Sequence, residues 1–279
     1  MNIAANDTEP MPPPKRELFY RHRLPTRITH WLTAIAVFGL LMSGMGIFNA
    51  HPRLYWGMAG SNSDPALLEM TTESGKGVVR IGSLTLKTDG VFGRSEVNGQ
   101  LFSRGFPAAV TLPGPQNLAT ARRWHFFFAW IFGLSLTTYF VFSIANGHLR
   151  HDLAPKKGEL SLRHILHDIV EHAKLNFPKG DAAKNYNILQ KIAYLGTLVA
   201  LLPTMILTGL TMSPGFNAVA PWLLTLFGGR QSARTIHFIA AAGVVAFILV
   251  HLLMVVLAGP INEIRSMITG RFAIPPEKK

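Results

Sequence analysis

Residues 234–251 read RTIHFIAAAGVVAFILVH, and this stretch carries two histidines, His237 and His251, in one apolar segment. Their separation of 14 residues corresponds to roughly 21 Å along an α-helix. The hydrocarbon core of a bilayer is about 30 Å thick. A helix that crosses the membrane here would therefore carry one histidine near each surface.

Four windows share this apolar character, and each has about 20 residues with almost no formal charge, which is the length that a membrane-spanning helix needs. Lipid offers the backbone no water to bond, so each window should form a helix that satisfies its own hydrogen bonds. The sequence therefore predicts an all-α integral membrane protein with a bundle of four transmembrane helices. The predicted spans are residues 28–48, 125–145, 192–212 and 236–258.

The formal net charge of +12 could suggest binding to nucleic acid, but the placement of the charges argues against it. Residues 1–27, 146–191 and 259–279 hold 17 of the 27 lysines and arginines, and residues 49–124 and 213–235 hold the other ten. Basic residues gather in cytoplasmic segments of membrane proteins. We therefore expect both terminal tails and the 146–191 loop in the cytoplasm, the other two loops outside, and no nucleic-acid partner.

Three of the histidines in the spans follow an arginine by three residues, and each motif stands where a helix is expected to start. The motifs are Arg27 to His30, Arg122 to His125 and Arg234 to His237. Because the chain has no cysteine, disulfides, iron–sulfur clusters and covalently attached c-type haem are excluded. A b-type haem held by histidines is not excluded.

The expected topology sorts four histidines by depth. His30 and His251 fall near the inner surface, and His125 and His237 near the outer surface. A single membrane histidine is often only a hydrogen-bonded helix contact, but two pairs at matched depths favour ligation. Neutral imidazole is an axial ligand of haem iron. The sequence predicts two b haems, an inner one on His30 and His251 and an outer one on His125 and His237.

The arginines of the motifs fit the same interpretation. Residues i and i+3 share a helix face, so each arginine lies one turn nearer to water than its histidine. A guanidinium there could pair with a haem propionate, although arginines at helix ends also simply extend toward water. The predicted propionate partners are Arg27, Arg122, Arg123 and Arg234.

The loop of residues 49–124 is unusually long, and such loops usually have a function or lack order. Alternation over Val78–Lys87 and the turn signal Thr88-Asp89-Gly90 predict a small β-hairpin in it. Its aromatic residues favour a surface that docks a partner over a simple cap on the helix ends.

The 146–191 loop contains a predicted amphipathic helix that lies on membrane lipid, with Ser161 as its N-cap. Its apolar face is formed by Leu162, Ile165, Leu166, Ile169, Val170 and Ala173. At the start of the loop stand His148, His151 and Asp152, which are candidates for quinone binding or proton transfer. They could equally be ordinary interfacial residues.

Arg27-x-x-His30-Trp31, the His125 helix and the His237/His251 pair resemble the bacterial di-haem cytochrome b family. That family includes the b-type cytochrome of nickel–iron hydrogenases, the gamma subunit of formate dehydrogenase and prokaryotic cytochrome b-561. RRWHFF at 122–127, GHLRHDL at 147–153 and FGGRQSAR at 227–234 are similar to the thiosulfate reductase cytochrome b subgroup. The resemblance implies a bacterial inner-membrane protein with two b haems, quinone chemistry at the inner haem and a periplasmic partner, often a molybdopterin oxidoreductase.

The leading hypothesis is a di-haem membrane subunit that transfers electrons between a periplasmic, molybdopterin-type oxidoreductase and the quinone pool. A stand-alone cytochrome b-561-type quinol oxidoreductase without a permanent partner is the alternative. A haem-free transporter that uses histidines as proton relays is a third possibility. Its weakness is that the fourth span lacks the Gly/Pro break that such transport sites often use.

Overall fold

The computed structural model describes residues 17–97, 99–178 and 180–274. The four predicted helices are present, and each is long and apolar enough to cross a membrane. They are α1 (Leu24–Phe48), α2 (Leu118–Ala145), a third span over Ile188–Thr211, and α8 (Arg230–Ala258). All four begin four to seven residues earlier than predicted, because each helix continues through the charged residue before its apolar window. That residue is an arginine in α1, α2 and α8, and Lys191 in the third span. The Arg-x-x-His motifs therefore lie inside the helices.

Local sequence signals explain where these helices start. Pro25 occupies the first turn of α1, where its missing N–H costs no hydrogen bond. The side chain of Asn117 caps α2 by accepting from the backbone of Thr120. α8 begins after Gly229, whose φ of 111° suits glycine. A Cβ there would also collide with Gly57 and Met58, so this glycine lets the first outer loop pack on the helix start.

The third span is not a regular helix. It consists of α4 (Ile188–Leu195), a π-helical stretch η4 (Gly196–Leu201) and α5 (Leu202–Thr211). The π-helical stretch ends two residues before Pro203, whose ring nitrogen cannot donate to the hydrogen-bond ladder of the helix. Asn187 and Gln190 form a capping box at its start.

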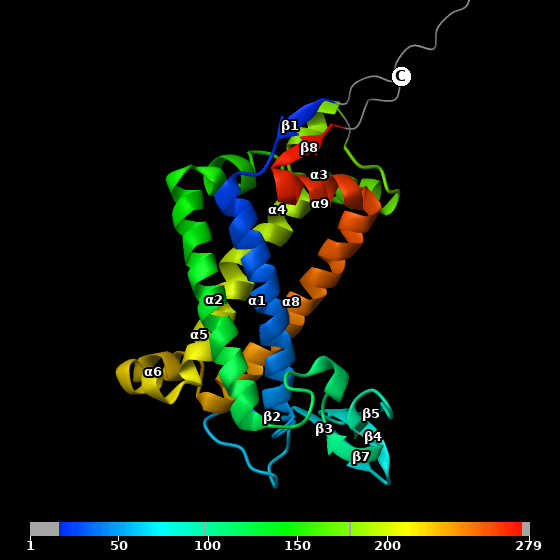
Figure 1. Cartoon of the computed structure of the whole chain (residues 1–279), viewed down its shortest axis with the longest axis vertical. Helices are drawn as coiled ribbons and strands as arrows, with labels where there is room; N and C mark the ends of the chain where they lie inside the picture. Colours follow the sequence, from blue (N-terminus) through cyan, green and yellow to red (C-terminus); the bar gives the residue numbers. More distant parts are fainter. Residues whose placement is uncertain (1–16, 98, 179, 275–279) are drawn as a thin grey trace, which may run out of the picture.

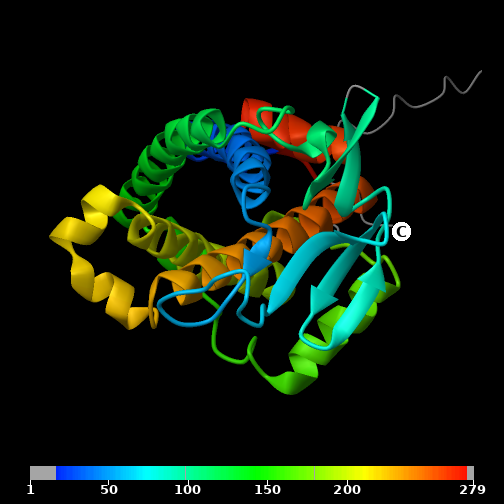
Figure 2. The same cartoon turned by 90° about the horizontal axis from the view of Figure 1, so that it is seen from below.

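The spans pack as two pairs, α1 on α2 and α5 on α8 (Figures 1 and 2). A buried apolar cluster joins the two pairs in the middle of the bundle. Its members are Ala36, Phe132, Leu136, Leu202 and Val244. This apolar layer therefore separates the two ends of the bundle, where the histidines lie.

The first outer loop folds into more β-structure than the predicted hairpin. The predicted strand Val78–Lys87 is itself two paired strands that turn at Gly82 and Ser83, and the expected turn at Thr88-Asp89-Gly90 lies after the second of them. Strands β2 (Arg53–Leu54), β3 (Leu68–Glu73), β4 (Lys76–Ile81) and β5 (Leu84–Lys87) form one antiparallel sheet in that order. Strands β6 (Gly93–Val97) and β7 (Gln100–Arg104) form a separate hairpin. The all-α description is thus incomplete: the membrane part is helical, and the outer end carries a small β unit, seen at the bottom of Figure 1.

Three short helices complete the outer end. The 3₁₀ turn η1 (Ala108–Val110) leads back toward α2. The second outer loop holds α6 (Pro214–Val219) and α7 (Pro221–Leu226), which project away from the β unit (Figure 1).

The opposite end of the bundle is also structured. Within the expected tails, β1 (Leu18–Tyr20) pairs with β8 (Arg271–Ala273), and α9 (Pro260–Thr269) follows α8 directly. The first 16 residues of the predicted 1–27 tail lie outside the described residues. The pairing of β1 with β8 brings both described chain ends to the same end of the molecule, as two pairs of spans require. Which membrane side this end faces stays a prediction, and the names inner and outer for the two ends, their loops and their histidines follow that prediction.

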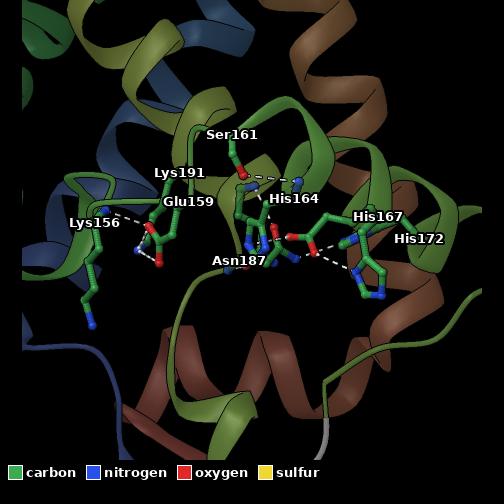
Figure 3. Close-up of polar contacts among 10 residues, drawn as sticks. Lys156, Glu159, Ser161, His164, His167, His172, Asn187 and Lys191 are labelled. Atoms are coloured by element: carbon green, nitrogen blue, oxygen red, sulfur yellow. Dashed lines mark hydrogen bonds and ion pairs between the residues drawn. The ribbon is translucent and has the colours of Figure 1, made fainter.

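The loop between α2 and α4 contains the π-helical turn η2 (Leu149–Leu153), the predicted amphipathic helix α3 (Leu162–Ala173) and the 3₁₀ turn η3 (Gly180–Lys184). Ser161 caps α3 as predicted. Figure 3 shows how the loop is tied to α4: Lys191 pairs with Glu159 at 2.8 Å, and His172 bonds Asn187 at 2.9 Å. The apolar face of α3 is largely exposed in the described structure, with Leu162 71% exposed and Leu166 51% exposed. Contact of this face with lipid stays a prediction.

Candidate functional site

The outer histidines meet between the two helix pairs. His125 of α2 and His237 of α8 have ring centroids 6.4 Å apart. Both rings are largely buried, two turns into their helices. The structure thus brings together the two histidines that sequence reasoning paired at the outer level.

Each outer ring bonds a buried hydroxyl from the neighbouring helix. Nδ1 of His125 lies 3.1 Å from the Ser43 hydroxyl of α1, and Nδ1 of His237 lies 2.9 Å from the Thr208 hydroxyl of α5. With Nδ1 engaged in this way, Nε2 of each ring is left for another partner.

An aromatic cluster covers the outer pair on its aqueous side. Phe238 follows His237 on α8 and packs against Phe48 at 4.9 Å between ring centroids, and Phe106 of the outer loop lies 5.7 Å from Phe48. The amide of Asn49 also bonds the Phe106 backbone in both directions, at 2.6 and 2.9 Å. The β unit is therefore fixed to the ends of α1 and α8 beside the outer histidines.

The inner histidines form a second pair with the same spacing. His30 of α1 and His251 of α8 have ring centroids 6.4 Å apart. Phe247 stacks on His251 at 5.7 Å with an interplanar angle of 11°, and Trp31 contacts His30 edge-on. In the described part of the chain, neither ring of this pair has a hydrogen bond to Nδ1.

Both pairs fit a metal shared by two imidazoles. Metal–imidazole bonds of about 2.0 Å would place the two ring centres roughly 6 Å apart, close to the 6.4 Å observed in each pair. No group of three or more His, Cys, Asp or Glu side chains that could hold a bare metal ion occurs among the described residues. The donor set therefore suits a haem, whose porphyrin supplies the remaining ligands. Ligation itself stays a prediction.

The predicted propionate partners differ in their surroundings. Arg27 has a buried Nε without a hydrogen-bond partner in the described structure, which suits a carboxylate partner. Arg122 and Arg123 are exposed at the start of α2. Arg234 already donates to the His51 carbonyl at 2.5 Å and lies over the Phe48 ring, so part of its guanidinium holds the outer loop.

The predicted quinone and proton residues lie at the inner end, in and beside η2. Nδ1 of His148 lies 2.6 Å from a carboxylate oxygen of Asp152. Both residues and His151 line a cavity of about 270 Å³ that also contacts β1 and Tyr186. Burial and the nearby charge of Arg21 lower the pKa of His22 to about 4, and His148 contributes to this shift. His22 is therefore neutral near pH 7.

Sequence reasoning missed several residues of these two sites. Ser43 and Thr208 stand in the similar stretches LMSGMG (41–46) and ILTGLT (206–211), and this internal likeness between the first and third spans could have revealed them. At the inner end, Tyr194 contacts both Tyr186 and Phe247, which links His251 to the largely buried guanidinium of Arg21. No pattern in the sequence points to this aromatic chain.

Comparison with known proteins agrees with the geometry. The family model for prokaryotic cytochrome b561 matches residues 21–270, which include all four spans and both histidine pairs. The chain is 29% identical over 242 residues to the Azospira oryzae protein named "Putative protein-methionine-sulfoxide reductase subunit YedZ1", covering 87% of this chain and 93% of that protein. No solved structure matches the chain.

The matched region extends from just before α1 to the end of α9, so it contains the whole membrane bundle and the outer β unit. The resemblance inferred from the histidine motifs is thereby confirmed at the level of the family. The chain belongs to the prokaryotic cytochrome b561 family of multi-pass bacterial membrane proteins, which carry electrons on haem b.

Proposed function

We propose that this chain is the di-haem membrane subunit of a periplasmic oxidoreductase and exchanges electrons between that partner and the quinone pool. The observation that carries the proposal is the pair of histidine contacts, each with 6.4 Å between ring centroids, at opposite ends of one bundle. Haem iron held at each pair would accept and release one electron at a time.

Helix α8 contributes one histidine to each pair, and this fixes the spacing between the two levels. His237 and His251 are roughly 21 Å apart along the helix axis. The apolar layer around Phe132 and Leu202 fills the space between them and excludes water. Electrons, and not protons, would therefore pass between the two sites.

The outer β unit supports a docked partner above the outer pair. It exposes a set of apolar side chains, namely Trp56, Met58, Leu84, Leu101 and Phe102. Two basic residues of the unit have partners within it: Arg104 is buried and bonds the Phe106 carbonyl, and Arg80 pairs with Glu69 and Glu73. An apolar contact therefore fits this surface better than charge steering.

The proposed partner is a separate oxidoreductase of the molybdopterin type. The Azospira oryzae relative is named as a subunit of a methionine-sulfoxide reductase, which supports a separate oxidoreductase as the partner of this chain. The sequence resemblance to the thiosulfate reductase subgroup favours a molybdopterin enzyme. With the basic inner end in the cytoplasm, that enzyme would sit in the periplasm.

Exchange with quinone requires groups that can hold or release a proton, and such groups lie at the inner end. His148, His151 and Asp152 place ionisable groups beside a cavity at the same end as His30 and His251. Such groups could hold or move a proton when quinone gains or loses electrons.

Haem content and partner capture test the proposal. The purified chain should give two haems per polypeptide in a pyridine haemochrome assay, with two potentials in a redox titration. A value near zero would favour a haem-free transporter. Mild-detergent purification from the native membrane should also recover a molybdenum-containing protein.

Point variants on the β unit separate docking from folding. Leu101→Ser with Phe102→Ser should abolish capture of the partner and leave both haem spectra intact. The matched control is Val219→Ser, another highly exposed apolar residue of the outer end, on α6 away from the β unit. Unchanged capture and unchanged electron transfer in the double variant would instead favour the stand-alone quinol oxidoreductase.

A further inference from the structure

The outer histidines receive matched support from the two helices that carry no outer histidine. We propose that Ser43 and Thr208 are positioning residues for the outer haem: each fixes the Nδ1–H tautomer of one histidine and directs its Nε2 to the iron. This inference rests on the proposed haem ligation by His125 and His237.

The hydrogen positions follow from the acceptors around Ser43. Its hydroxyl oxygen lies 2.6 Å from the Gly39 carbonyl and 3.1 Å from Nδ1 of His125. A carbonyl can only accept, so the single hydroxyl proton is donated to Gly39. The oxygen can then only accept from His125, and Nδ1 must carry the ring proton. Nε2 keeps its lone pair, which is the form that binds a metal.

Thr208 repeats the arrangement on the other side. Its hydroxyl oxygen lies 2.5 Å from the Thr204 carbonyl and 2.9 Å from Nδ1 of His237. Ser43 and Thr208 are both fully buried, so water does not compete for either bond. The same reasoning therefore assigns Nδ1–H and a free Nε2 to His237.

A glycine follows each hydroxyl residue and faces the same ring. A Cβ at Gly44 would lie 3.5 Å from Cε1 of His125, and a Cβ at Gly209 would lie 3.5 Å from Cε1 of His237. Cε1 is the ring carbon between Nδ1 and Nε2. The next nearest ring atom is Nδ1 in both cases, at 3.7 Å for Gly44 and 3.9 Å for Gly209, so each glycine lets its helix approach the side of the ring that bonds the hydroxyl.

The two halves of the bundle have the same arrangement of a hydroxyl, a glycine and a histidine. In each half, a hydroxyl–glycine pair on the first helix contacts a histidine on the second: α1 with α2, and α5 with α8. His30 and His251 have no such hydroxyl partner in the described structure. The support is therefore specific to the outer site and is not a general feature of histidines in this bundle.

The hydroxyl bonds should affect both binding and potential. A partner that accepts from Nδ1–H makes the imidazole a stronger donor and holds its orientation, and loss of such partners typically lowers metal affinity about 10–100-fold. A stronger donor favours the oxidised, more positive iron, so removal of the hydroxyl should raise the midpoint potential of the outer haem.

The test uses the purified full-length holoprotein. Ser43→Ala and Thr208→Val should each raise the outer midpoint potential and speed haem loss to apomyoglobin, with the inner haem unchanged. Ser43→Thr and Thr208→Ser keep the hydroxyl and should behave like the wild type. Thr211→Val is the matched control, because the buried Thr211 hydroxyl bonds the Thr208 carbonyl, at 2.6 Å, and neither histidine among the described contacts.

The outcomes are distinguishable. Equal behaviour of Thr208→Val and Thr211→Val, or a shift of the inner haem alone, would overturn the positioning role. If Thr208→Val cannot retain haem, Thr208→Ser decides: retention with an unshifted potential supports the role of the hydroxyl, and loss overturns it. Absence of an outer haem in the wild type would instead refute the proposed function itself.

Discussion

The outer and inner histidine pairs have the same ring spacing but different surroundings. The outer rings bond buried hydroxyls and lie beneath an aromatic cluster. The inner rings contact aromatic side chains, and the nearby cavity is lined by charged and titratable groups. The difference suggests a division of labour, with a rigid, dry outer site for electron exchange with a protein and a wetter inner site for a small molecule that carries protons.

The largest expected effect separates the two sites outright. His237→Ala should remove the outer haem and leave the inner one, and His251→Ala should do the reverse, so each variant retains one haem per polypeptide. The pyridine haemochrome assay and a redox titration measure this. His172→Ala on α3 is the control, because His172 bonds Asn187 and belongs to neither pair. Loss of only the inner haem in His237→Ala would contradict the pairing.

The space beside the outer rings gives the next largest effect. Gly44→Leu and Gly209→Leu should displace His125 and His237, respectively, and lower outer haem content while the inner haem remains. Gly133→Leu serves as control, since no atom lies within 4 Å of a Cβ at Gly133. The two haems differ in midpoint potential, so a redox titration measures the content of each haem separately. Equal loss of both haems in Gly44→Leu would indicate a folding defect and no specific contact.

The wetter inner site is tested by its ionisable residues. His148→Ala combined with His151→Ala should slow electron exchange with quinol several-fold, because proton-carrying groups are removed beside the inner pair. Stopped-flow reduction of the haems by a quinol, with both haem spectra intact, measures this. The control is His164→Ala with His167→Ala, exposed on α3 at the same end. Unchanged quinol kinetics would remove His148 and His151 from the mechanism.

The sequence predicted the parts of the molecule that depend on local composition and on helix geometry. Span positions follow from apolar length, and the pairing of His125 with His237 follows from alternating helix direction. Helix starts were placed late, because a charged arginine ends an apolar window but does not end a helix. The capping role of Ser161 was also readable from local sequence.

The missed features depend on which elements meet in space. Ser43 and Thr208 matter only because α1 packs on α2 and α5 on α8. The pairing of β1 with β8 joins segments about 250 residues apart in sequence, and short polar tails give no periodic signal for it. The outer sheet was underestimated because the strands other than Val78–Lys87 alternate too weakly to predict.

The smallest expected effect concerns the rigidity of the inner end, where Glu159 pairs with Lys191 and ties the α3 loop to α4. Burial raises the pKa of Glu159, but hydrogen bonds from Lys191 and the Lys156 backbone outweigh it and lower the pKa overall. A lowered carboxylate pKa stabilises the folded state above the usual pKa of glutamate and loses that contribution as pH falls through the folded value. The pair should therefore hold the loop at neutral pH and release it in acid.

Glu159→Gln should accordingly lower the free energy of local opening of α3 by about 1 kcal/mol at pH 7. As pH falls toward 4, the wild type should approach the variant, because its own carboxylate becomes protonated. Amide hydrogen exchange of residues 162–173 in the holoprotein measures the opening. Glu171→Gln is the control, since Glu171 bonds only neighbours within the same loop among the described residues, Lys174 and Asn176, and should leave the tie to α4 unchanged. A difference between Glu159→Gln and the wild type that persists unchanged at pH 4 would show that the ion pair does not hold this loop.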